Sequence, residues 1–408
     1  MSRSLRPASL RVQVGLFTAI RLAVNTSTRM IYPFLAVFAR GLGVDLASIS
    51  LVLTVRALMG ALSPLLAPIA DRSGRKTSML LGLGIFTLSA VLVAIWPSYI
   101  TFFLAVVLGF LGIYIYLPAM QAYLGDTIAY QQRGQVLAIT ELGWSVSFIV
   151  GAPLAGFLIA RYGWQAPFPL AAAGALLMMG LVAWLVPFIP SSHGAVSGSL
   201  KNFWRALVAP SVMAALALSL TFTCANEVVN VVFGVWMEDS FNLKIAALGA
   251  ASAVIGFSEL GAEGLSAWLV DRLGKERAVT IGLLGNALVA LMLPWLGRSL
   301  VGAMVGLGLF YLTFEFAIVC SLPLMTEILP SARATLMGLN VAVFSLGRAL
   351  GAWLAPHFYA WGFWANALAA VGFDLLALLA LSRIKIGGGE ENFAVKVAAE
   401  SAKAPDKI

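Results

Sequence analysis

The segment DRSGRK at residues 71–76 occurs a second time in the chain as DRLGKER at residues 271–277. The aspartate, the arginine after it and the glycine keep their spacing, and each lies 200 positions after its counterpart. A second landmark has the same offset, because Arg133 in AYQQRGQ corresponds to Arg333 in LPSARAT. Two unrelated landmarks that share one offset indicate a duplicated unit.

Apolar runs surround both copies and continue along the whole chain of 408 residues. Each run has about 20 residues, which is long enough to cross the hydrocarbon core of a bilayer as a helix. The runs do not alternate with period two as the strands of a membrane barrel do. Only 11% of residues are charged and 61% are hydrophobic, whereas roughly a quarter are charged in soluble domains. The sequence therefore predicts an all-α integral membrane protein with twelve transmembrane helices. The predicted spans are 12–38, 48–70, 77–96, 99–125, 134–160, 165–187, 211–236, 245–270, 277–297, 299–326, 334–357 and 362–383.

The domain organisation follows from the longest polar interruption, SSHGAVSGSLKNFWRAL, between the sixth and seventh spans. Its serine and glycine content is typical of a flexible linker. We predict an N-terminal six-helix bundle at 1–190, a cytoplasmic linker at 191–208, a C-terminal six-helix bundle at 209–384, and a flexible cytoplasmic tail at 385–408.

The orientation follows from the lysines and arginines, because basic loops stay in the cytoplasm. With the N-terminus inside, the outer loops hold only Arg40, Arg161, Lys244 and Arg298, and the inner loops and tail hold most of the other basic residues. This predicts a multi-pass protein of the cell membrane with both termini cytoplasmic. The net charge of +8 is explained by this asymmetry, so we expect the lipid bilayer and no nucleic acid as a partner.

Together these features resemble the major facilitator superfamily of secondary transporters over nearly the whole chain. The residues that carry the resemblance are the two DRxG segments, the twelve spans and the central inner loop. The resemblance implies two pseudo-symmetric six-helix bundles and transport of a small molecule by alternating access. We expect a monomer that is not an enzyme and has no cofactor or metal site. The chain departs from the family pattern at Ala67 and Ala267, where glycine is usual, and its fourth span lacks the arginine–glycine pair of many proton-coupled members.

By the same resemblance, the loop after the second span is a gate. Asp71 would contact the start of the eleventh helix and Arg75 would pair with Asp126, so that the halves are held together on the inner side in the outward-open state. A carboxylate suits the positive end of a helix, and Gly74 permits a tight turn. The alternative is that these basic residues only satisfy the positive-inside bias. The predicted gating residues are Asp71, Arg72, Gly74, Arg75, Asp126 and Asp271.

Polar residues also lie inside the spans, where lipid would be expected. Arg21, Asn25 and Arg29 recur every four residues and form a stripe about 12 Å long on one helix. Facing lipid would cost several kcal/mol, so the stripe is expected to face the interior. In the family fold the first, fourth, seventh and tenth helices line a central cavity. The predicted substrate-binding or coupling residues are Arg21, Asn25, Arg29, Tyr114, Gln121, Glu141, Asn226, Glu227, Asn230, Tyr311, Glu315 and Arg348.

Glu227 and Glu315 are the candidates for proton coupling. A buried glutamate can become neutral by binding a proton, whereas arginine keeps its charge and must be paired, hydrated or bound to an anion. For every one of these charges, a fixed ion pair between helices is the structural alternative. Glu259 and Glu263 share a helix face and can hold a cation or pair with Arg348 or with Arg56.

The segment GAPLAG at residues 151–156 partly matches GPxxGG, the antiporter signature of the superfamily, and favours export. Tyrosines, methionines and a few charges suit an amphipathic ligand. We therefore predict proton-coupled efflux of a small amphipathic organic compound. The alternative is uptake or exchange of a small organic anion, suggested by the arginines of the first helix. An intramembrane enzyme is a remote alternative, because the chain has two histidines, no His-Glu-x-x-His pair and no nucleotide loop. A channel or a non-transporting receptor also stays open.

Overall fold

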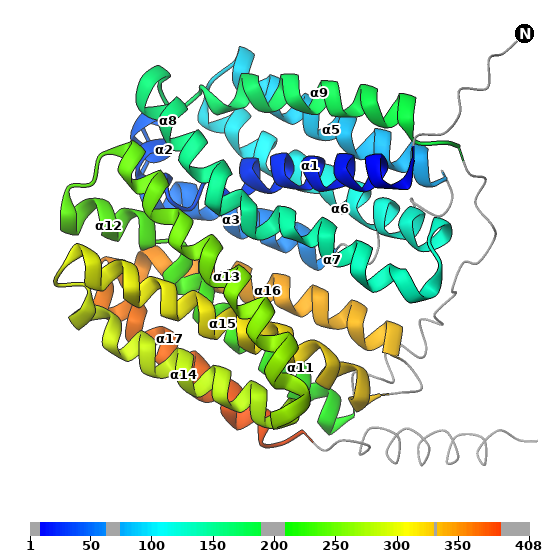
Figure 1. The fold of residues 1–408 in the computed structure, drawn as a ribbon. Coiled ribbons are helices and arrows are strands. Elements are labelled where there is room, and N and C mark those ends of the chain that lie inside the picture. Colours follow the sequence, from blue (N-terminus) through cyan, green and yellow to red (C-terminus); the bar gives the residue numbers. More distant parts are fainter. Residues whose placement is uncertain (1–8, 63–73, 189–208, 330–332, 385–408) are drawn as a thin grey trace, which may run out of the picture.

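The computed structural model describes residues 9–62, 74–188, 209–329 and 333–384, which form long helices joined by short connections (Figure 1). The helices of the N-terminal half are α1 (Leu10–Arg29), α2 (Leu35–Leu42), α3 (Leu46–Ala61), α5 (Arg75–Ile95), α6 (Tyr99–Thr127), α7 (Tyr130–Val146), the π-helical turn η1 (Ser147–Gly151), α8 (Ala152–Tyr162) and α9 (Pro167–Leu185). Those of the C-terminal half are α11 (Pro210–Asn230), α12 (Phe233–Phe241), α13 (Ile245–Leu273), α14 (Lys275–Leu296), α15 (Leu300–Ile328), α16 (Arg333–Tyr359) and α17 (Phe363–Leu381).

These helices confirm the predicted fold class, an all-α integral membrane protein. Ten helical runs in the described part are long and apolar enough to cross a membrane, and the bent pair α2 and α3 raises the number to eleven. Helix α1, which carries the polar stripe, is not among them. The arrangement is consistent with twelve spans, because α1 with α2 covers the first predicted span and α3 begins the second. The rest of the second span, the linker and the tail lie outside the described residues.

The duplication seen in the sequence extends to the local structure of the two halves. Gly74 precedes α5 with φ 81° and ψ 150°, and Gly274 precedes α14 with φ 82° and ψ 147°. Ser98 caps α6 by accepting a hydrogen bond from the Thr101 amide at 3.2 Å. Ser299 caps α15 in the same way through the Gly302 amide at 3.1 Å. Glycine adopts positive φ without strain, so the two halves begin equivalent helices with equivalent turns.

The apolar core shows how the two halves meet. One cluster contains residues of both halves, among them Phe34 and Phe38 with Phe233 and Trp236. The other two clusters each belong to a single half, one formed around Phe17 and Tyr123 and the other around Leu283 and Met325. The halves therefore share a core near one end of the bundle and have separate cores toward the other. We call these the Arg40 end and the Arg75 end, after a residue located at each.

Backbone contacts close the Arg40 end. A Cβ atom added to Gly234 would lie 2.4 Å from the Pro33 carbonyl oxygen, and one added to Gly249 would lie 2.8 Å from that of Ala152. The Ser50 hydroxyl donates a hydrogen bond to the Ala352 carbonyl. Such close approach is the use of small residues in membrane helix packing. The structure thus represents a state in which the halves are joined at the Arg40 end.

Candidate functional site

Two helix breaks lie where the site is found. Pro33 has no amide N–H to donate, so the first helix stops at Arg29 and resumes at Leu35 as α2. The equivalent helix of the second half ends at Asn230 and resumes at Phe233. Broken helices of this kind are typical of transporter binding sites near the membrane midplane, because the interrupted backbone lines a cavity rather than lipid.

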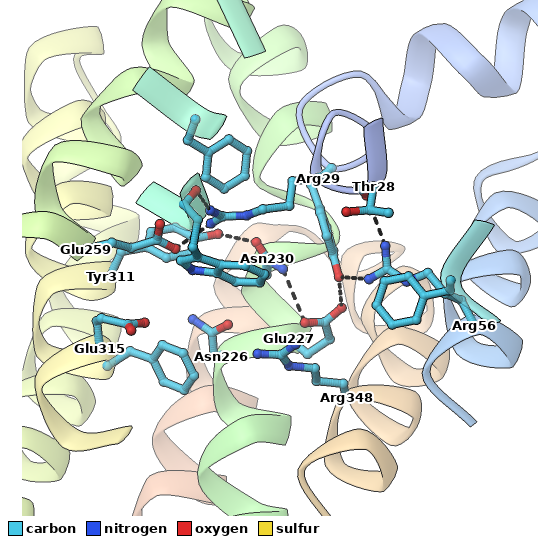
Figure 2. Close-up of a pocket in the computed structure, with 15 residues that line it drawn as sticks. Thr28, Arg29, Arg56, Asn226, Glu227, Asn230, Glu259, Tyr311, Glu315 and Arg348 are labelled. Carbon is cyan, nitrogen blue, oxygen red and sulfur yellow. Dashed lines mark hydrogen bonds and ion pairs between the residues drawn. The ribbon is translucent and has the colours of Figure 1, made fainter. Parts of the chain in front are cut away.

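A cavity between the halves adjoins both breaks (Figure 2). Its free volume is about 50 Å³, which holds a few water molecules. Residues from both halves line it, including Tyr32, Arg56 and Trp144 from the N-terminal half. The sequence-predicted residues in its wall are Arg29, Asn226, Glu227, Asn230, Tyr311, Glu315 and Arg348.

A chain of hydrogen bonds crosses the cavity wall from one half to the other. Arg56 donates from Nη2 to the Tyr32 hydroxyl at 2.5 Å, and that hydroxyl donates to Glu227 Oε1 at 2.7 Å. Asn230 Nδ2 donates to the other Glu227 oxygen at 3.2 Å, and the Tyr311 hydroxyl donates to Asn230 Oδ1 at 2.5 Å. Glu227 is buried, with 2% of its surface exposed. One carboxylate thus connects groups from both halves.

Arg29 forms the second connection between the halves. Its guanidinium makes a buried ion pair with Glu259 on α13 and donates to the Trp144 carbonyl at 2.8 Å. The guanidinium carbon lies 4.0 Å from the centre of the Trp144 ring and 3.8 Å from that of Phe148. Phe148 belongs to the turn η1, and π-helical turns are frequent at functional sites. Arg29 is therefore held by charge, hydrogen bonds and aromatic faces together.

Two charged residues of the wall have no such partner. In the part of the chain that the structure describes, Glu315 on α15 and Arg348 on α16 line the cavity without a hydrogen bond or ion pair. Asn226 Nδ2 is also buried without a hydrogen-bond partner. The cavity wall contains three arginines and three glutamates, so its charges balance when all six groups are ionised.

The other predicted residues lie away from the cavity. Arg21 makes a two-pronged pair with Glu141, with N···O distances of 2.6 and 2.5 Å, inside the N-terminal half. Asn25 is buried, Tyr114 packs edge-on against Phe110, and Gln121 is partly buried. A stripe with four-residue spacing turns by about 80° over eight residues of a helix, which explains why Arg29 reaches the cavity and Arg21 does not.

Tyr32, Trp144 and Phe148 were not singled out from the sequence. Tyr32 occupies the helix break, and the proline that follows it was the signal that could have indicated its place. No sequence pattern could have predicted that Trp144 and Phe148 belong to the site, because their contact with Arg29 depends on how α1 packs against α7 and η1. Among the described residues, no group of three His, Cys, Asp or Glu side chains is arranged to hold a metal ion.

The gating residues lie at the Arg75 end. Arg75 Nε is 3.3 Å from Asp126 Oδ2, which is the pairing expected from the family resemblance. Asp271 is exposed at the end of α13, whereas Asp71 and Arg72 lie outside the described residues. The second half has an equivalent ion pair, Lys275 with Glu327, which the sequence analysis missed. The gating role itself stays a prediction.

Comparison with known proteins decides the family. Residues 17–352 match the Major Facilitator Superfamily. The chain belongs to this family. It is therefore a multi-pass membrane transporter of a small molecule. One relative is the uncharacterized MFS-type transporter YwfA of Bacillus subtilis (strain 168), with 27% identity over 91% of this chain and 89% of that protein.

A shorter match links this transporter to multidrug resistance protein 2 of Bacillus subtilis (strain 168), with 30% identity over 24% of each chain. Among solved structures, a peptide transporter POT in complex with alafosfalin superimposes with a TM-score of 0.73 at 16% identity, over 94% of this chain and 96% of that one. A bacterial homolog of the human lysosomal transporter Spinster gives 0.73 at 14% identity, over 92% and 96%. At these identities the structures show a shared fold.

Proposed function

We propose that this transporter exports a small amphipathic organic compound in exchange for protons, by alternating access. The observation that carries the proposal is the hydrogen-bond chain through Glu227. Its carboxylate accepts hydrogen bonds from Tyr32 and Asn230 and so joins the two halves. A proton on this carboxylate removes its charge and one of its acceptor positions. Binding and release of a proton would then change how strongly the halves are connected at the cavity.

The conformation is consistent with one step of such a cycle. If the N-terminus is cytoplasmic, the closed Arg40 end faces outward, and this state of the cycle is closed to the outside. Substrate would enter from the Arg75 end as a proton leaves. The Arg40 end would then open, release the substrate and take up the next proton. Glu227 lies where the two halves meet, so a change in its protonation would alter its hydrogen bonds to Tyr32 in one half and to Asn230 in the other.

Two further observations support export of an amphipathic compound. The cavity wall mixes charges and amides with Phe110, Trp144, Phe148 and Phe314, a combination suited to an organic molecule with apolar and polar parts. The antiporter-like segment 151–156 forms a close contact between the halves, because a Cβ on Gly156 would lie 3.2 Å from Gly249 Cα. The partial match to a multidrug resistance protein agrees with this direction.

The runner-up, uptake or exchange of an organic anion, depended on the arginines of the first helix. Arg21 and Arg29 are both paired with glutamates in the structure. Their charges are therefore compensated without an anion, and this arrangement gives the runner-up no specific support.

The test is transport in proteoliposomes under an imposed pH gradient. A panel of amphipathic organic dyes would identify a transported compound for the wild type, and Glu227→Gln would then be compared with it. We expect the gradient to accelerate wild-type transport and to have no effect on Glu227→Gln. Glu276→Gln is the matched control, because Glu276 is exposed at the start of α14 and lies outside the cavity wall, and it should keep the response. Wild-type transport that ignores the gradient, or a full response in Glu227→Gln, would contradict the proposal.

A further inference from the structure

The charges of the cavity wall fall into two groups. Arg29 is compensated by Glu259. Arg56 is connected to Glu227 through the Tyr32 hydroxyl and also donates to the Thr28 carbonyl at 3.0 Å. Each of these four charged groups is connected across the interface between the halves, although Arg56 Nε and Glu259 Oε2 have no hydrogen-bond partner. Their charges are therefore already compensated without a ligand.

Glu315 and Arg348 form the second group. Both line the cavity, and in the described part of the chain neither has a hydrogen bond or an ion pair. No N···O separation of 4.0 Å or less joins Glu315 and Arg348, so the two charges do not form an ion pair with each other. Both side chains face the free volume of the cavity. One negative and one positive group are therefore available at the same cavity.

A third group points to the same ligand. Asn226 lines the cavity and has 6% of its surface exposed, yet its Nδ2 has no hydrogen-bond acceptor. Figure 2 shows this amide between Glu315 and Arg348. A buried donor without a partner costs free energy, so an acceptor on a bound ligand would stabilise it. A ligand that pairs with these cavity groups would therefore need a hydrogen-bond acceptor as well as two opposite charges.

We infer that Glu315, Arg348 and Asn226 bind a zwitterionic substrate, with its ammonium group at Glu315 and its carboxylate at Arg348. A simple cation would displace the water around Arg348 without replacing it by a counter-charge, and a simple anion would do the same at Glu315. Each leaves one desolvated charge, which is strongly unfavourable. A zwitterion compensates both groups and keeps the cavity neutral. Glu315 lies on α15 and Arg348 on α16, and they do not form an ion pair, so the two charges of the ligand are separated by a linker.

The inference rests on the proposed function and sharpens it. It assigns Glu315 to the substrate and leaves Glu227 to bind the coupling proton. Phe314, the neighbour of Glu315 in the cavity wall, provides an apolar surface for the linker. The proposed compound is amphipathic in a specific sense, with opposite charges at its two ends and an apolar middle.

The test is equilibrium binding to the purified wild-type transporter by calorimetry, with linear probes that differ only in their end groups. The zwitterions are 4-aminobutanoate, 6-aminohexanoate and 8-aminooctanoate, and the singly charged probes are hexylamine and hexanoate. We expect at least one zwitterion to bind more tightly than both singly charged probes, by about tenfold or more. If a singly charged probe binds as well as the best zwitterion, or if none of the three zwitterions binds, the inference is overturned.

Two variants assign the ends of the ligand. Glu315→Gln should weaken binding of the best zwitterion by about tenfold and should not weaken hexanoate, because the uncompensated Glu315 charge opposes anion binding. Arg348→Gln should weaken the same zwitterion and should not weaken hexylamine, because the uncompensated Arg348 charge opposes cation binding. Glu276→Gln is the control, because Glu276 is exposed at the start of α14, and it should bind all probes as the wild type does. Equal losses for all probes in both variants would indicate a structural role and contradict the assignment.

The outcome separates this inference from the proposed function. Binding is measured without a pH gradient, so the preference for zwitterions is scored independently of gradient-driven transport. If the panel shows no such preference while gradient-driven transport of another compound still requires Glu227, the zwitterion assignment falls and the proton-coupled transport stands.

Discussion

The two halves of the transporter are alike at the Arg75 end and complementary at the cavity. At the Arg75 end Gly74 and Gly274 adopt the same backbone conformation, and each half has one basic residue paired with one acid. At the cavity the N-terminal half supplies Arg29 and Arg56, whereas the C-terminal half supplies Arg348 and all three glutamates, Glu227, Glu259 and Glu315. The two halves therefore share one scaffold but have different charges at the cavity. The contacts between these charges, such as the Arg29–Glu259 ion pair, join the halves and must break and form again during transport.

The largest expected effect comes from breaking one of these connections. Arg29→Met leaves Glu259 buried without its partner, since both side chains are less than 10% exposed. Loss of one member of a buried pair costs about 3–5 kcal/mol. We expect a clear drop in the thermal unfolding midpoint in detergent, with substantial recovery in the Arg29→Met/Glu259→Leu double variant. A single variant as stable as the wild type, or a double variant no better than the single, would contradict the role given to this pair.

The next effect concerns the closed Arg40 end. Gly234→Ala puts a Cβ atom 2.4 Å from the Pro33 carbonyl oxygen, so the halves must move apart there, at a cost of about 1–3 kcal/mol. A cysteine placed at Val37, which is buried in the shared core, should then react faster with a water-soluble thiol reagent. Gly372→Ala is the matched control in the same half, because a Cβ there meets nothing within 4 Å. Equal labelling rates in the two variants would show that Gly234 is not needed for closure.

The two DRxG segments offer a comparison between the repeats themselves. Asp71→Asn should slow turnover and leave the apparent substrate affinity nearly intact, because a gate residue acts on the conformational step. Asp271→Asn should have a smaller effect, since Glu276 interrupts the basic run of the second copy. Initial rates over a range of substrate concentrations in proteoliposomes measure both. A pure affinity defect in Asp71→Asn would count against the gate.

The smallest effect is expected for the exposed pair at the Arg40 end. Arg40 Nη2 lies 2.6 Å from Glu238 Oε1, but the arginine side chain is 59% exposed. Exposed pairs contribute about 0–1 kcal/mol and are screened by salt. Arg40→Gln should therefore lower the unfolding midpoint far less than Arg29→Met, with little remaining difference at high salt. If Arg40→Gln lowered the unfolding midpoint as much as Arg29→Met does, solvent exposure would not explain how much each ion pair contributes to stability.

Much of the fold could be predicted from the sequence because each step had a simple physical signal. The length of the apolar runs predicted the membrane spans, and the offset shared by two landmarks indicated the duplicated unit. The pairing of Arg75 with Asp126 followed from resemblance. The helix breaks did not follow from hydropathy, since Tyr32 and Pro33 sit inside a run that is apolar on average.

The site could be predicted only in outline. Polar residues inside spans pointed to Arg29, Glu227 and Glu315, which the structure places at one cavity. The same reasoning also selected Arg21 and Glu141, which pair with each other elsewhere. Sequence spacing gives the face of a helix but neither its rotation against its neighbours nor the partner across the interface. That is why the pairing of Arg29 with Glu259, rather than of Glu259 with Arg348 or Arg56, required the structure.

The central claim is that the halves move about one cavity, so that one end closes as the other opens. The most direct measurement is of spin-label distances by pulsed electron resonance, between residues 47 and 360 at the Arg40 end and between residues 135 and 277 at the Arg75 end. All four positions are exposed, and the native Cys224 and Cys320 are buried. Glu227→Gln removes the charge that connects Tyr32 and Asn230 across the halves, and this weaker connection should lengthen the first distance and shorten the second. Distances that both stay fixed, or that change in the same direction, would contradict the account.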